Sequence, residues 1–108
     1  MIVITNTIRV KKGAGESLAE RFNRPGEVEK SQGFLALNLL QTRDTEEYDE
    51  FVVWTMWTSK EAHDEWTRGE TFRKSHSGPR PDFILSSKIT YYDVVGQRNP
   101  VSSPLEVN

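Results

Sequence analysis

The run from residue 51 to residue 57 constrains the fold most, because it is apolar on both faces of any strand that it forms. Its sequence, Phe51-Val-Val-Trp-Thr-Met-Trp57, combines aromatic and β-branched side chains, which is typical of a central strand. Each face of such a strand needs a covering layer. The rest of the chain, or a second chain, has to provide those two layers.

The flanking sequence predicts three more strands and two helical regions, because apolar residues recur with period two in some stretches and at helical spacing in others. In chain order we expect a strand over 2–10, a helix near 16–22 with a further turn at 27–30, strands over 34–42 and 51–57, a helix that begins at Thr58 or Ser59 and is broken at Gly69, a short helix with Phe72 and His76, and a strand over 83–95. This is the order of the ferredoxin-like βαββαβ fold, an α+β fold with an antiparallel sheet.

We expect one domain over residues 1–95 and a loosely held C-terminal tail over 96–108. Two helices can cover only one face of a four-stranded sheet. The strands nevertheless carry bulky apolar residues on both faces, so the uncovered face needs a partner. The pattern predicts a symmetric homodimer in which two sheets pack into an α+β barrel.

The charge and cysteine content exclude several classes of partner. Fourteen basic and sixteen acidic residues are interspersed and leave a net charge of −2, so neither nucleic acid nor a membrane surface is expected as a partner. The apolar run at the N-terminus is too short for a membrane span and lacks the basic region of a signal peptide. With no cysteine, the chain is expected to be cytoplasmic.

Asn6 is the first polar residue that the pattern singles out. It falls on the face of the first strand that also carries Ile2, Ile4 and Ile8. A carboxamide buried there must find a partner or cost about 1–3 kcal/mol. Two interpretations follow: Asn6 bonds the backbone of a nearby loop, or it donates a hydrogen bond to a ligand held between the sheet and the helices.

His76 is the leading candidate for metal or proton chemistry among only two histidines. It shares a helix face with Phe72, and no nearby His, Cys or carboxylate completes a zinc or non-haem iron site. One histidine is enough for haem, because the porphyrin supplies four nitrogens. Trp66, at helical spacing, is expected to be a core residue, and His63 lies among charged residues and is expected to be solvated.

Taken together, these residues resemble the IsdG-type haem-degrading monooxygenases. The resemblance spans nearly the whole chain, and the combination of Asn6, Trp66 and His76 is its most specific part. The segments that carry it are Ile4-Thr-Asn-Thr7, Glu20-Arg-Phe22, Gly33-Phe34, Trp57-Thr-Ser-Lys-Glu-Ala62, Trp66, Phe72-Arg-Lys-Ser-His76 and Ile89-Thr-Tyr-Tyr-Asp-Val94.

The resemblance implies a dimeric α+β barrel that binds one haem per subunit. It implies that His76 is the axial ligand of the haem iron, that Asn6 forms a hydrogen bond on the distal side, and that Trp66 presses on the porphyrin and ruffles it. Phe22 would lie near the haem. Haem would be both cofactor and substrate, and O2 with electrons from an external reductase would open its ring and release iron for nutritional use.

Other functions remain open on this fold. A cofactor-free monooxygenase of the antibiotic-pathway type would need no axial ligand and would leave His76 unexplained. A non-catalytic haem carrier would use the same pocket as the enzyme. A structural dimeric module would need no ligand.

Overall fold

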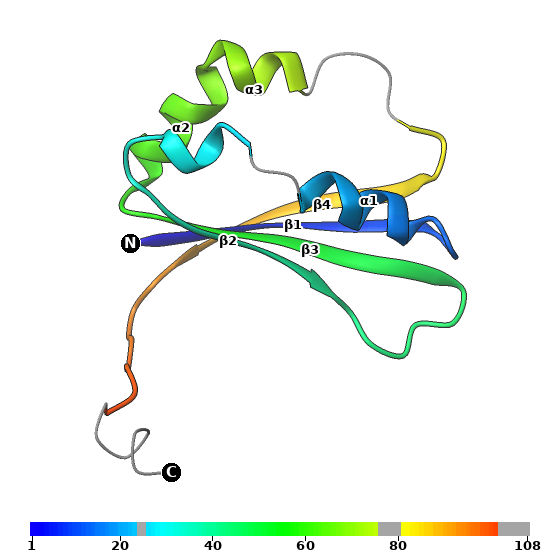
Figure 1. Ribbon diagram of the computed structural model, residues 1–108. Helices are drawn as coiled ribbons and strands as arrows, with labels where there is room; N and C mark the ends of the chain where they lie inside the picture. Colours follow the sequence, from blue (N-terminus) through cyan, green and yellow to red (C-terminus); the bar gives the residue numbers. More distant parts are fainter. Residues whose placement is uncertain (24–25, 76–80, 102–108) are drawn as a thin grey trace.

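The computed structural model describes residues 1–23, 26–75 and 81–101. Its elements in chain order are β1 (Ile2–Lys11), α1 (Gly15–Phe22), the 3₁₀ turn η1 (Val28–Lys30), β2 (Phe34–Gln41), β3 (Tyr48–Trp57), α2 (Lys60–Arg68), α3 (Glu70–Ser75) and β4 (Ile84–Asp93). The strands form one antiparallel sheet in the order β2-β3-β1-β4 (Figure 1). The predicted βαββαβ order and the ferredoxin-like fold class are confirmed.

The helix ends follow local rules that the sequence contains. The Ser59 side chain accepts a hydrogen bond from the backbone N–H of Ala62 at 3.2 Å and so caps the start of α2. At the other end, Gly69 has extended backbone angles and separates α2 from α3. The predicted cap and the predicted break are both confirmed.

β3 begins at Tyr48, three residues earlier than the apolar run predicts. Tyr48, Asp49 and Glu50 extend the strand because they pair with the end of β1. Polar contacts replace apolar packing there, since Arg9 Nε donates to Glu50 Oε1 at 3.0 Å and its guanidinium lies over the Tyr48 ring.

All the described helices lie on one side of the sheet (Figure 1). The core on that side consists of two separate clusters. One, beneath α1, is formed by Ile8, Val10, Leu18 and Phe51. The other, beneath α2, is formed by Ile2, Ile4 and Trp57. Along β1 the two clusters are separated by one inward position, which is that of Asn6.

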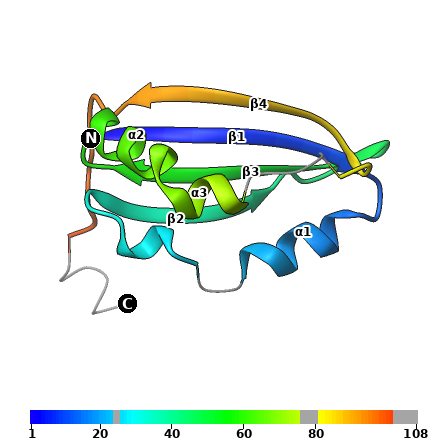
Figure 2. The same ribbon diagram turned by 90° about the horizontal axis from the view of Figure 1, so that it is seen from above.

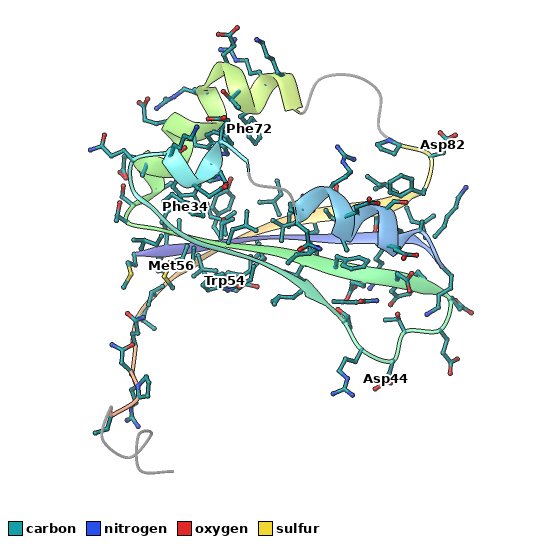
Figure 3. All side chains as sticks on the ribbon, viewed as in Figure 1. Phe34, Asp44, Trp54, Met56, Phe72 and Asp82 are labelled. Atoms are coloured by element: carbon teal, nitrogen blue, oxygen red, sulfur yellow. The ribbon has the colours of Figure 1, made fainter. Side chains whose placement is uncertain are left out.

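The opposite side of the sheet has no described helix over it. Trp54 and Met56 of β3 point away from the helices (Figure 3). Tyr92 of β4 is on this same side, because it pairs with Val3, which pairs in turn with Met56. The expected coverage of only one face is therefore confirmed within the described ranges. None of the helices in those ranges is long and apolar enough to cross a membrane.

Candidate functional site

Asn6 lies in the row of residues between the two core clusters. Its neighbours across the sheet are Val53 on β3 and Ile89 on β4. The Oδ1 atom of Asn6 is buried and has no hydrogen-bond partner among residues 1–23, 26–75 and 81–101. No described loop backbone satisfies this oxygen, which favours a ligand role over a structural one for the carboxamide.

The space beside Asn6 is open on the β4 side. Ile89 is on the helix-covered face, yet 58% of its surface is exposed. The reason is visible from above, where β4 and the middle of β1 run clear of the described helices (Figure 2). An apolar side chain left exposed next to a carboxamide with an unpaired oxygen is typical of the floor of a binding site for a largely apolar ligand.

Aromatic residues stand on either side of this floor. Phe22, in the last turn of α1, packs against the cluster beneath α1. Trp66 of α2 packs against the cluster beneath that helix. The Phe72 ring of α3 meets the Trp66 ring edge to face, with centroids 6.0 Å apart. Trp66 is half-buried, so the predicted core contact is present and part of the indole remains accessible.

His76, the predicted axial ligand, lies outside the described residues. α3 ends at Ser75, immediately before it. No group of three His, Cys, Asp or Glu side chains that could hold a metal ion occurs in the described part of the chain. Of the other predicted site residues, Phe22 packs on the cluster beneath α1 and Trp66 on the cluster beneath α2, where Phe72 meets its ring. Asn6 lies on β1 in the row between these two clusters.

A groove of about 630 Å³ lies between the turn before β2 and the α2–α3 pair. Of the predicted site residues it includes Trp66 but neither Asn6 nor Phe22. Trp66 therefore borders this groove and also packs on the core beneath α2. Other lining residues are Gly33, Ala62 and Gly69, with the carboxylates of Glu61, Glu65 and Glu70.

His63 is not a solvated surface residue, and that prediction is wrong. Only 16% of its side chain is exposed, and its Nδ1 atom is buried. α2 lies with this side against the sheet, so the imidazole contacts the rings of Trp57 and Tyr91. Burial lowers the pKa of His63, because a charged imidazolium would lose hydration there. His63 is spaced three residues from Trp66, so the two occupy neighbouring positions on α2, but this spacing alone does not fix how the helix is rotated on the sheet.

The sequence is similar to those of known proteins over most of its length. Residues 1–78 match the family described as antibiotic biosynthesis monooxygenase. The chain is 46% identical over 105 residues to a heme-degrading monooxygenase of Bacillus mycoides, covering 95% of this chain and 98% of that protein. It is 45% identical over 105 residues to a heme-degrading monooxygenase of Bacillus cereus.

Solved structures give the same picture at the level of the fold. The heme-degrader MhuD from Mycobacterium tuberculosis, with two hemes bound in its active site, superposes with a TM-score of 0.72 and 32% identity. The match covers 92% of this chain and 100% of MhuD. SnoaB from Streptomyces nogalater, a cofactor-independent oxygenase, superposes with a TM-score of 0.61 at 16% identity and shares the fold alone.

Proposed function

Because the chain belongs to the antibiotic biosynthesis monooxygenase family and to its heme-degrading branch, we propose that it is an oxidoreductase that opens the porphyrin ring of haem. The observation on this chain that carries the proposal is the buried Asn6 Oδ1 atom, which has no hydrogen-bond partner among the described residues and lies between two apolar clusters. A flat, apolar molecule with a polar centre fits such a place.

Haem is the substrate, and different residues of the chain would contact its macrocycle and its iron. Val53 and Ile89 offer apolar contacts to the macrocycle on either side of Asn6. The indole of Trp66 is a large rigid surface that can press on the ring from α2. Phe22 packs on the cluster beneath α1 and would lie near the haem on that side. His76, directly after α3, would be the axial ligand of the haem iron through a neutral imidazole nitrogen.

Asn6 would orient the reacting oxygen rather than transfer a proton. A carboxamide donates hydrogen bonds through its NH2 group and does not ionise. Placed beside the porphyrin, it can hold oxygen near one edge of the ring. The overall reaction consumes O2 and electrons, and a separate reductase would supply those electrons. The ring is opened and iron is released, which would serve iron nutrition in the cytoplasm.

A homodimer would complete the molecule. Trp54, Met56 and Tyr92 lie on the sheet face that carries no described helix, and a second copy of that face would cover them. Two such sheets form the predicted barrel, with residues 1–95 as the enzyme domain and 96–108 as the tail. Each subunit keeps its own Asn6 on the outer, helix-covered side.

The test is a titration of the purified protein with hemin, followed in the Soret band. A saturable shift is expected, and a protein that leaves the hemin spectrum unchanged would contradict both the enzyme and the haem carrier. His76→Ala is expected to abolish the spectrum of an imidazole-ligated haem and to stop turnover, since the iron loses its protein ligand. Wild-type turnover in that variant would remove His76 from the site.

A further inference from the structure

His63 occupies an aromatic cluster that holds α2 to the sheet. Its ring meets that of Trp57 with centroids 5.4 Å apart and an interplanar angle of 77°. On the other side it meets the Tyr91 ring at 6.3 Å and 82°. Both contacts are edge-to-face, the arrangement that aromatic rings prefer. The imidazole is therefore a spacer between the central strand β3, the edge strand β4 and α2.

The same cluster reaches Trp66. Trp57 is 1% exposed and belongs to the core cluster on which Trp66 packs. His63 and Trp66 are three residues apart on α2 and so lie on neighbouring positions of one helix face. A change in how His63 packs on Trp57 is therefore expected to move the turn of α2 that carries Trp66.

The surroundings of His63 suit a neutral ring and oppose a charged one. Neither His63 Nδ1 nor Trp57 Nε1 has a hydrogen-bond partner among the described residues. The titratable groups around the imidazole are Asp64 and Lys60 on its own helix and the Tyr91 phenol on β4. Asp64 Oδ1 is 3.9 Å from His63 Nδ1, and the other oxygen of Asp64 is engaged by Lys60 Nζ at 2.9 Å. Asp64 favours the charged imidazole, but the loss of hydration on burial outweighs it and leaves the pKa of His63 lowered.

We propose that His63 is a positioning residue: its neutral imidazole, wedged between Trp57 and Tyr91, sets the place at which the Trp66 indole meets the substrate. Protonation would pull the ring towards Asp64 and solvent and would loosen this turn of α2. The inference rests on the proposed function for the identity of the substrate, but its structural part concerns the chain alone.

The structural part is tested without haem by NMR of the full chain. Two histidines and three tryptophans give few imidazole and indole N–H signals, which single substitutions assign. As the pH falls from about 7.5 to about 5, the indole signals of Trp57 and Trp66 are expected to move together with the titration of His63. Trp54, on the other side of the sheet, is the internal control and should not follow it. A Trp66 signal that ignores the His63 titration would overturn the proposal.

The catalytic part uses His63→Phe, which keeps an aromatic ring and removes the titration. At saturating hemin the turnover of wild-type protein is expected to fall at least about twofold between about pH 7.5 and pH 5, as His63 becomes protonated and the Trp66 indole is displaced. Every other ionisable group is common to the two proteins, so only the difference between the two profiles reports on His63. The His63→Phe profile should be markedly flatter, and identical profiles would contradict the proposal.

The proposed function and the positioning role of His63 can be refuted independently of each other. Wild-type protein that never degrades hemin would refute the proposed function, while the NMR titration would still decide whether His63 positions Trp66. If His63→Phe does not fold, His63→Gln is the second variant for the turnover profiles, and the wild-type NMR titration needs no variant beyond those used for assignment.

Discussion

Asn6 Oδ1 differs in its surroundings from the other buried side-chain atoms that lack a hydrogen-bond partner in the described part of the chain. Trp57 Nε1 and His63 Nδ1 lie within an aromatic cluster that excludes a ligand, whereas Asn6 Oδ1 lies between two clusters beside the exposed Ile89. An unpaired buried oxygen lowers stability. A residue that lowers stability at an open position is typical of a binding site.

Asn6→Ala is expected to leave hemin binding largely intact and to lower turnover by roughly 10², as for the loss of one oriented donor. The free energy of unfolding should stay the same or rise by about 1 kcal/mol, because the variant removes a buried unpaired group. Stopped-flow turnover and urea denaturation measure the two quantities. Asn38→Ala is the matched control, since Asn38 pairs with Trp54 on the other face of the sheet. Loss of folding in Asn6→Ala would instead support a structural role.

Residue patterns predicted Asn6 but not His63, for a physical reason. Period two along β1 fixes which side chains share a face, so the odd carboxamide stands out from sequence alone. How deeply a helical residue is buried depends on how the helix is rotated over the sheet. The charged neighbours of His63 are compatible with either rotation, and only packing on Trp57 and Tyr91 decided it.

At the scale of elements, Gly33 fixes how closely α2 approaches the turn before β2. Its backbone is in the left-handed region, with a φ of +85°. A Cβ atom at this position would lie 2.5 Å from the Cβ of Ala62 and 2.7 Å from Thr58 Oγ1. The absence of a side chain at Gly33 thus allows the positive φ of the turn. It also allows α2, which carries His63 and Trp66, to pack closely against that turn.

Gly33→Ala is therefore expected to lower the free energy of unfolding by more than Gly13→Ala does. Both substitutions bear the strain of a positive φ, about 1–2 kcal/mol, because Gly13 has a φ of +89°. Gly13 has no neighbouring atom within 4 Å of the added Cβ, so the difference between the variants isolates the clash with α2. Thermal denaturation gives both values. An equal decrease in the free energy of unfolding of the two variants would mean that α2 does not pack closely on this turn.

The order and type of the elements could be predicted because each one has its own periodicity and its own stop signals, such as Gly69 and the Ser59 cap. The gap between the two core clusters could not, because it arises from where α1 and α2 settle on the sheet. That placement depends on long-range packing, such as that of Leu18 in the cluster beneath α1 and of Trp66 on the cluster beneath α2.

At the scale of the whole molecule, the sheet has a helical side and a bare side. Two adjacent tyrosines of β4 lie on these opposite sides. Tyr91 is 52% exposed on the helical side and Tyr92 is 51% exposed on the bare side. Their nearly equal exposure in one chain makes them a matched pair for the proposed dimer.

Tyr92→Glu is expected to shift the protein towards monomer, because a charge would be buried between two sheets at considerable cost. Tyr91→Glu should leave the dimer intact, although it removes a contact of His63. Sedimentation velocity at micromolar concentration distinguishes the two species. A wild-type protein that is a stable monomer, or two variants with the same behaviour, would rule out the barrel.

The most direct test of haem degradation is mass spectrometry of the tetrapyrrole after hemin is incubated with the protein, air and a reductant, with catalase present to remove free peroxide. We predict an opened ring that has gained oxygen and lost its iron, formed by wild-type protein and much more slowly by Asn6→Ala. Intact hemin recovered from the wild-type reaction would contradict the account, and together with a stable Soret shift it would identify a carrier instead.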